Sequence, residues 1–275
     1  MFKKLKYQDY LLLLFLIAAQ YSCALRAKVS KDVDTVGTLI PENGLIDRDS
    51  TWSGEVRLDR DILVFPNVTL TIAPGTHIIF APTRTSLIEP RFLFTKHELL
   101  VQGRLMAKGS AEAAIIFTSG DVKPAEGNWA GIILDNPKGG DSLLEYCRIE
   151  YAEIGVYCIN ASPQINKSLL QNNQTGIICQ RGSHPHINAN VIKSGEIGIA
   201  CWDKAAPKIE NNEISQEKQA GLVWAEATPV LMRNSIRGNK YGLYGDESLE
   251  WANNQIEGNA QDFYLSPQVN HQAGE

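Results

Sequence analysis

Apolar residues recur along the second half of the chain with a period of about 22 residues. From residue 142 onwards the chain aligns with itself in six segments, whose starts lie 21, 22, 22, 22 and 20 residues apart. An aliphatic residue stands seven positions after each start, and in the first five segments a glycine followed by an aliphatic residue comes later. A fixed period is typical of repeat proteins, whose stacked units bury a shared core. The segments start at Ser142, Pro163, Pro185, Pro207, Pro229 and Leu249.

Within each segment, apolar and polar residues alternate with a period of two, as in the stretch 207–215. Most helical repeats need about 33 residues or more, and leucine-rich repeats need several leucines and a helical segment in each unit. Short alternating strands separated by Gly and Asn turns favour a different architecture. The sequence predicts an all-β fold, a single-stranded parallel β-helix solenoid with about 22 residues per coil.

A polar column supports this geometry, because Asn recurs five residues after the later segment starts. Asn tolerates the left-handed backbone conformation that a sharp corner needs. At the ~4.8 Å spacing of stacked strands, Asn amides can also hydrogen-bond from coil to coil. We therefore expect a structural ladder. Its positions are Cys147, Ser168, Asn190, Asn212, Asn234 and Asn254.

Several motifs resemble the right-handed parallel β-helix family, which includes pectin-lyase-like and NosD-type repeat proteins. They are Asn-Asn-x-Ile at 211–214 and 253–256, the glycine-aliphatic step, and upstream segments that continue the pattern. The resemblance covers roughly residues 50 to 265 and implies a right-handed coil. It leaves the function open, because the same coil carries lyases, hydrolases, adhesins and phage spikes. The upstream segments are 67–80, 100–109, 115–119 and 129–132.

Residues 1–24 have the features of a secretory signal peptide. A lysine-rich start precedes an apolar run from Leu11 to Ala19, shorter than the ~20 residues that span a bilayer. Two processing sites are consistent with the sequence. Residues 16–23 resemble a bacterial lipoprotein signal that would lipidate Cys23, although Gln20 replaces the usual aliphatic residue, and cleavage after Ala24 is the alternative. Both predict export to the periplasm, outer membrane or cell surface, with membrane attachment only through a lipid on Cys23.

The remaining chain divides into three parts. We predict that residues 25–50 form a tether or an N-terminal cap, that residues 51–266 form the β-helix, and that residues 267–275 are a frayed tail. Insertions in solenoids gather on one face and often carry binding. The loops that we expect to protrude are 81–97, 121–128 and 136–141.

Composition narrows the class of partner. The chain has 275 residues, of which 44% are hydrophobic, and a formal net charge of −5. Nucleic-acid binding would need a basic face, so no nucleic-acid partner is expected. A polysaccharide or an envelope protein is the expected partner.

Three cysteines follow the repeat glycine by three residues, at Cys158, Cys179 and Cys201, and Trp224 takes the same place in the next coil. The main interpretation is an interior ladder of inert thiols. A disulfide and a soft-metal site are the alternatives, but the spacing is unlike a zinc motif. We expect neither a metal nor another cofactor.

Candidate catalytic groups are sparse. Pectate-lyase-type catalysis, which the resemblance implies, needs converging carboxylates that hold calcium. Glycoside hydrolysis needs two carboxylates about 5–10 Å apart. Asp203 and Glu226 share one turn column with Arg181 and Glu247, and nothing else marks them. We therefore predict no catalytic residue.

A polar strand face is the best candidate for a binding site, because positions one and three of each coil should point the same way. The leading hypothesis is an exported, envelope-associated and non-catalytic β-helix that serves as a rigid scaffold or a glycan- or protein-binding surface. The alternative is a lyase, epimerase or hydrolase acting on acidic polysaccharide. The candidate binding residues are Gln164, Asn166, His186, Asn188, Lys208 and Glu210.

Overall fold

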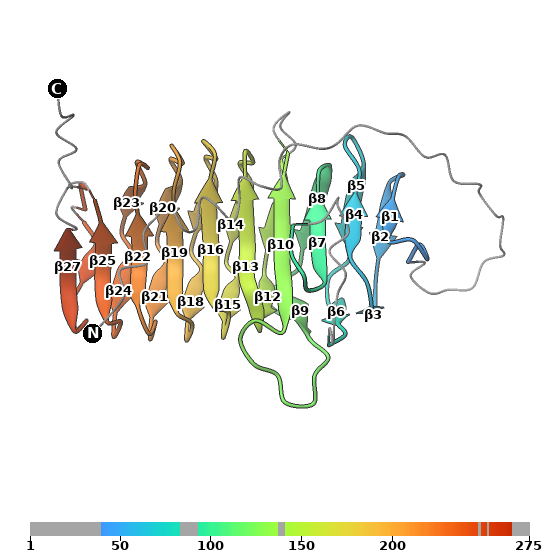
Figure 1. Ribbon diagram of the computed structural model, residues 1–275, viewed down its shortest axis with the longest axis horizontal. Coiled ribbons are helices and arrows are strands. Elements are labelled where there is room, and N and C mark those ends of the chain that lie inside the picture. The colour runs from blue at the N-terminus through green and yellow to red at the C-terminus, as the bar shows by residue number, and fades with distance from the viewer. Residues whose placement is uncertain (1–39, 83–92, 137–140, 247–248, 252, 266–275) are drawn as a thin grey trace, which may run out of the picture.

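The computed structural model describes residues 40–82, 93–136, 141–246, 249–251 and 253–265. The described chain is built from short strands alone and winds into coils that stack along one axis, from β1 at one end to β27 at the other (Figure 1). Each strand pairs in parallel with the strand one coil later, as β14, β17 and β20 do. This confirms the predicted all-β parallel solenoid.

The coils contribute to three parallel sheets, named here sheet A, sheet B and sheet C. Sheet A has ten strands, sheet B eight and sheet C nine. The strands of sheet A are β1 (Leu45–Ile46), β4 (Ile62–Val64), β7 (Glu98–Val101), β10 (Trp129–Asp135), β13 (Ala152–Ile159), β16 (Thr175–Gln180), β19 (Ile197–Cys201), β22 (Ala220–Trp224), β25 (Tyr241–Gly245) and β27 (Gln261–Leu265).

A regular coil passes from sheet A to sheet B, turns a corner into sheet C, and turns again into sheet A of the next coil. The strands of sheet B are β2 (Ser50–Trp52), β5 (Thr69–Ile72), β8 (Arg104–Lys108), β11 (Leu143–Glu145), β14 (Gln164–Asn166), β17 (His186–Asn188), β20 (Lys208–Glu210) and β23 (Val230–Met232). Those of sheet C are β3 (Glu55–Leu58), β6 (His77–Phe80), β9 (Ile115–Ser119), β12 (Cys147–Glu150), β15 (Leu169–Gln171), β18 (Val191–Lys193), β21 (Glu213–Ser215), β24 (Ser235–Arg237) and β26 (Gln255–Ile256).

The core lies inside the coil and consists of rows of aliphatic side chains. In sheet B, Ile165, Ile187 and Ile209 stack in register and are fully buried, while their strand neighbours point outwards. Burying one such side chain contributes about 1.5–3 kcal/mol, so repetition over the coils supplies the main stabilisation.

The repeat glycine marks a close approach of two coils. A Cβ atom added to Gly176 would lie 2.6 Å from the carbonyl oxygen of Gly198, and one added to Gly198 would lie 2.6 Å from that of Gly221. No side chain fits at that distance. The glycine column therefore keeps neighbouring strands of sheet A at their pairing distance.

The two ends of the solenoid differ. At the N-terminal end Ile46 and Trp52 are buried, each with about 1% of its surface exposed. At the C-terminal end Trp251, Phe263 and Leu265 are 44%, 37% and 54% exposed. Within the described residues there is no helix that could cross a membrane.

Candidate binding surface on sheet B

The structure brings the six predicted binding residues together on the outer face of β14, β17 and β20. Gln164, His186 and Lys208 are register partners along one row, and Asn166, Asn188 and Glu210 along the next. We call these six residues the sheet B patch. Adjacent strands lie about 4.8 Å apart, so the patch repeats polar groups at that interval.

Glu210 is the centre of the patch. Its carboxylate accepts a hydrogen bond at 2.9 Å from His186 Nε2 and forms an ion pair with Lys208 Nζ at 3.0 Å. Arg233 Nη2 lies 3.9 Å from the other carboxylate oxygen. The hydrogen bonds from His186 and then Lys208 hold the pKa of Glu210 below its usual value. Three cationic or titratable side chains thus surround one carboxylate.

Amide groups extend the patch towards the corner with sheet C. Arg233 Nε donates to Asn211 Oδ1 at 2.8 Å, and Asn211 Nδ2 donates to Asn188 Oδ1 at 2.7 Å. The Nδ2 of Asn166 lies 3.5 Å from Gln164 Oε1, while its Oδ1 has no hydrogen-bond partner among the described residues. This oxygen is buried, so it is not open to a ligand.

The Asn ladder lies at this corner, and one expectation about it was wrong. The residues with a left-handed backbone stand one position before the ladder, at Ala189, Asn211 and Asn253 among others, with φ of 56°, 55° and 64°. The bend occurs first, and the following side chain then points into the stack. The Asn-Asn pairs therefore combine two roles, because Asn211 occupies the bend and Asn212 the ladder.

Within the ladder each amide joins two coils. Asn212 Oδ1 accepts from the backbone N–H of Asn190 at 2.9 Å and from its Nδ2 at 3.0 Å. Asn212 Nδ2 donates to the carbonyl of Ile187 at 2.9 Å and to Asn234 Oδ1 at 3.0 Å. Asn254 closes the series by accepting from Asn234. Buried backbone groups at the corner thereby gain partners that the strands cannot supply.

A second polar column, which the sequence reasoning missed, lies at the corner between sheet C and sheet A. Its signal was available, because these residues stand ten positions after each of the last five segment starts. Glu217 and Gly195 interrupt an otherwise Asn-rich series. The column consists of Asn173, Gly195, Glu217, Asn239 and Asn259.

The cysteines lie on consecutive strands of sheet A, where Cys158, Cys179 and Cys201 are register partners and Trp224 follows. All three are buried and carry free thiols. A hydrogen bond with Cys179, together with burial, holds the pKa of Cys158 well above its usual value. Burial raises the pKa of Cys179 in the same way. The thiols of Cys158 and Cys179 are therefore neutral, which disfavours reaction and soft-metal binding at these two residues.

The acidic turn column lies where the chain passes from sheet A to sheet B. Asp203 and Glu226 both adopt a left-handed backbone, and the backbone N–H of Glu226 donates to Asp246 at 3.1 Å. Within the described part of the chain, no three metal-binding side chains come together. Cys23 and Glu247 lie outside the described residues.

Comparison with known proteins places the fold in a family. The family model for the right-handed β-helix region matches residues 126–268, which is more than half of the chain. Searches among curated proteins and among solved structures gave no match. The matched residues include the regular coils and the sheet B patch. The chain belongs to the right-handed β-helix family.

Proposed function

We propose that this protein is an exported, non-catalytic β-helix whose sheet B patch binds a glycan. The observation that carries the proposal is the in-register arrangement of the six patch residues on three consecutive strands. Amide, imidazole, ammonium and carboxylate groups are the side chains that exchange hydrogen bonds with sugar hydroxyls. A rigid solenoid presents them with little ordering cost on binding.

The charge around the patch favours an acidic glycan. His186, Lys208 and Arg233 surround the single carboxylate of Glu210, and Lys167 at the same corner forms an ion pair with Glu145 at 3.0 Å. A uronate carboxylate placed beside Lys208 would gain a charge-assisted hydrogen bond. An acidic oligosaccharide should therefore bind more tightly than a neutral one at this face, and more weakly as salt rises.

The test is calorimetric titration of the full chain with tetragalacturonate. Lys208→Ala should weaken binding by about tenfold, which corresponds to the loss of one charge-assisted contact of roughly 1.4 kcal/mol. The matched control is Lys193→Ala, in the preceding segment and on β18 of sheet C. Equal affinity of both variants, or no binding by the wild type, would refute the patch as the site.

A separate assay addresses the enzymatic alternative. Incubation with polygalacturonate should leave the absorbance of unsaturated products at baseline. An increase that requires this protein would replace the binding proposal with lyase activity.

The export proposal rests on the lysine-rich start and short apolar run of residues 1–24. If Cys23 carries lipid, the wild-type protein partitions into detergent and Cys23→Ala is soluble or unprocessed. Stable anchoring needs more than one acyl chain. Identical partitioning of the variant would instead support cleavage after Ala24.

A further inference from the structure

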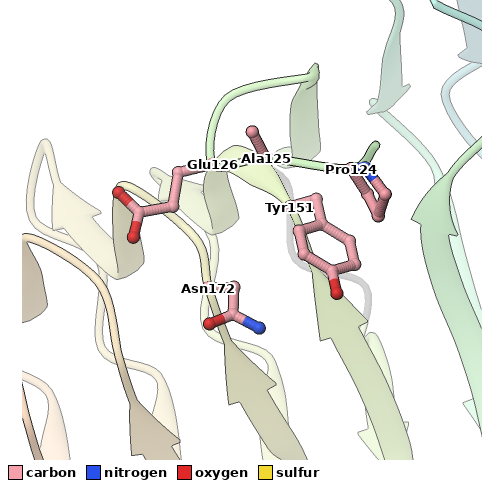
Figure 2. A pocket seen from close by; sticks show the side chains of 5 residues that line it. All are labelled: Pro124, Ala125, Glu126, Tyr151 and Asn172. Atoms are coloured by element: carbon pink, nitrogen blue, oxygen red, sulfur yellow. The ribbon is translucent and has the colours of Figure 1, made fainter. Parts of the chain in front are cut away.

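A hollow lies beneath the loop that joins β9 to β10, on a different corner from the sheet B patch. This loop, residues 120–128, projects from the solenoid (Figure 1). The hollow has a volume of about 520 Å³ and is a shallow depression, largely open to solvent. Its lining residues are Pro124, Ala125, Glu126, Tyr151 and Asn172 (Figure 2).

The loop is fixed over the hollow by contacts that reach far along the chain. Both carboxylate oxygens of Glu126 accept from Lys218 Nζ, at 2.8 and 2.7 Å, and Lys218 also contacts Glu196 at 3.1 Å. At the other end, the backbone N–H of Asn128 donates to the Tyr151 carbonyl at 2.8 Å. The hollow is thus formed before any ligand arrives, which lowers the ordering cost of binding.

Tyr151 occupies a position that its corner otherwise gives to smaller or more permissive residues. It has a left-handed backbone with φ of 66°, and the same place holds Asn172, Ser194, Gln216 and then glycine in later coils. A bulky aromatic residue is unfavourable in this conformation. The surrounding structure maintains this conformation, as it does for Tyr146 at the corner between sheets B and C. Here the ring forms a wall of the hollow.

The lining combines apolar faces with a few polar groups. Figure 2 shows Pro124 on one side of the Tyr151 ring, with the Glu126 carboxylate and the Asn172 amide on the other. A pyranose has the matching chemistry, since its C–H face packs on an aromatic ring and its hydroxyls meet amides and carboxylates at the edge.

The charge near the hollow selects among saccharides. Glu126 and Glu196 share the single cation of Lys218, and Lys96 is paired with Glu153 at 3.5 Å. Acidic groups therefore outnumber basic ones, which disfavours a polyuronate. We propose that this hollow binds a neutral pyranose unit of a polysaccharide, at a site separate from the sheet B patch.

The experiment uses the full chain and two probes, cellotetraose and tetragalacturonate, in calorimetric titrations. The wild type should bind cellotetraose, and Tyr151→Asn should weaken that binding by at least about tenfold. Asn suits the left-handed backbone, so the fold should remain intact. Asn172→Gly, which also suits this backbone, should weaken binding without unfolding the corner.

Tyr146→Asn is the matched control, because Tyr146 is also a left-handed tyrosine, with φ of 52°, but lies at the corner between sheets B and C. It should bind cellotetraose as the wild type does, and so should Lys208→Ala. The proposal is overturned if the wild type does not bind cellotetraose, if Tyr151→Asn binds it unchanged, or if Tyr146→Asn weakens it equally. If Lys208→Ala loses tetragalacturonate binding and still binds cellotetraose, the result bears on the sheet B patch and leaves the proposal for the hollow intact.

Discussion

The two corners that flank sheet C contain the same kind of polar column but fill it differently. At the corner between sheets B and C, Asn190, Asn212 and Asn234 repeat one hydrogen-bond pattern from coil to coil. At the corner between sheets C and A, Gly195 and Glu217 replace two of the amides. Gly195 has no side chain that could donate to the next coil, and its N–H donates to the Glu217 carboxylate at 2.8 Å.

The replacement has an electrostatic cost. Glu217 is 3% exposed, and burial raises its pKa to about 8, with a further contribution from the nearby charge of Glu126. The neutral amides of the other corner have no such dependence on pH. The corner between sheets C and A, called here the irregular corner, is also the one that the 120–128 loop covers, through Glu126 and Lys218. Departures from a repeat are expected where a site has been built.

The largest expected loss of stability comes from changing the corner between sheets B and C, where the same Asn hydrogen bonds repeat in each coil. Asn212→Ala should lower the free energy of unfolding by about 3–5 kcal/mol, because Asn190 and Ile187 lose partners while remaining buried. Urea denaturation would measure the change. Asn211→Gly, one residue earlier, keeps the left-handed backbone and should cost under about 0.5 kcal/mol. Similar losses in both variants would show that the ladder is not the source of stability.

The irregular corner should respond to pH instead. The folded-state pKa of Glu217, about 8, lies above the ordinary value of 4.5, so the folded protein holds this proton more tightly than the unfolded chain. Stability should then fall as pH rises from about 4.5 to 8, by roughly 2–4 kcal/mol from this group. Below that window the contribution is unchanged, because both states are protonated.

Glu217→Gln isolates this effect. Gln keeps an acceptor for the Gly195 N–H and cannot ionise, so the variant should melt at a higher temperature than the wild type at pH 8 and at a similar temperature at pH 4.5. Glu98, whose pKa burial also raises to about 8, titrates in both proteins and cancels in the difference. A difference in melting temperature between the two proteins that stays constant from pH 4.5 to 8 would contradict the assignment of this pH dependence to Glu217.

The smallest expected loss of stability is in the cysteine column, whose side chains pack in the core and take no part in the hydrogen bonds at the corners. Cys179→Ala should cost around 1 kcal/mol, the typical loss for a modest core truncation. In the native wild type, thiol reagents should label Cys158, Cys179 and Cys201 slowly, and all three should react after unfolding. Stoichiometric zinc or copper in protein purified without added metal would contradict the inert ladder.

The sequence alone determined the coil. Its 22-residue period, its alternation and its glycine column follow from local chemistry, because each coil repeats the same short strands and contacts only its neighbours. The sheet B patch followed from the same arithmetic, since alternate residues of a strand share a face. The Asn column was also visible, although the sequence did not show that the bend falls one residue earlier.

Only the tertiary structure decided what the irregular segments do. Glu126 and Lys218 are 92 residues apart in the chain, and no period relates them. The role of Glu217 depends on a missing side chain at Gly195 in the previous coil, and its raised pKa depends on burial in that gap. The hollow beside Tyr151 exists because a non-repeating loop bends back over a repeating corner, and that path is fixed by long-range contacts, not by local preference.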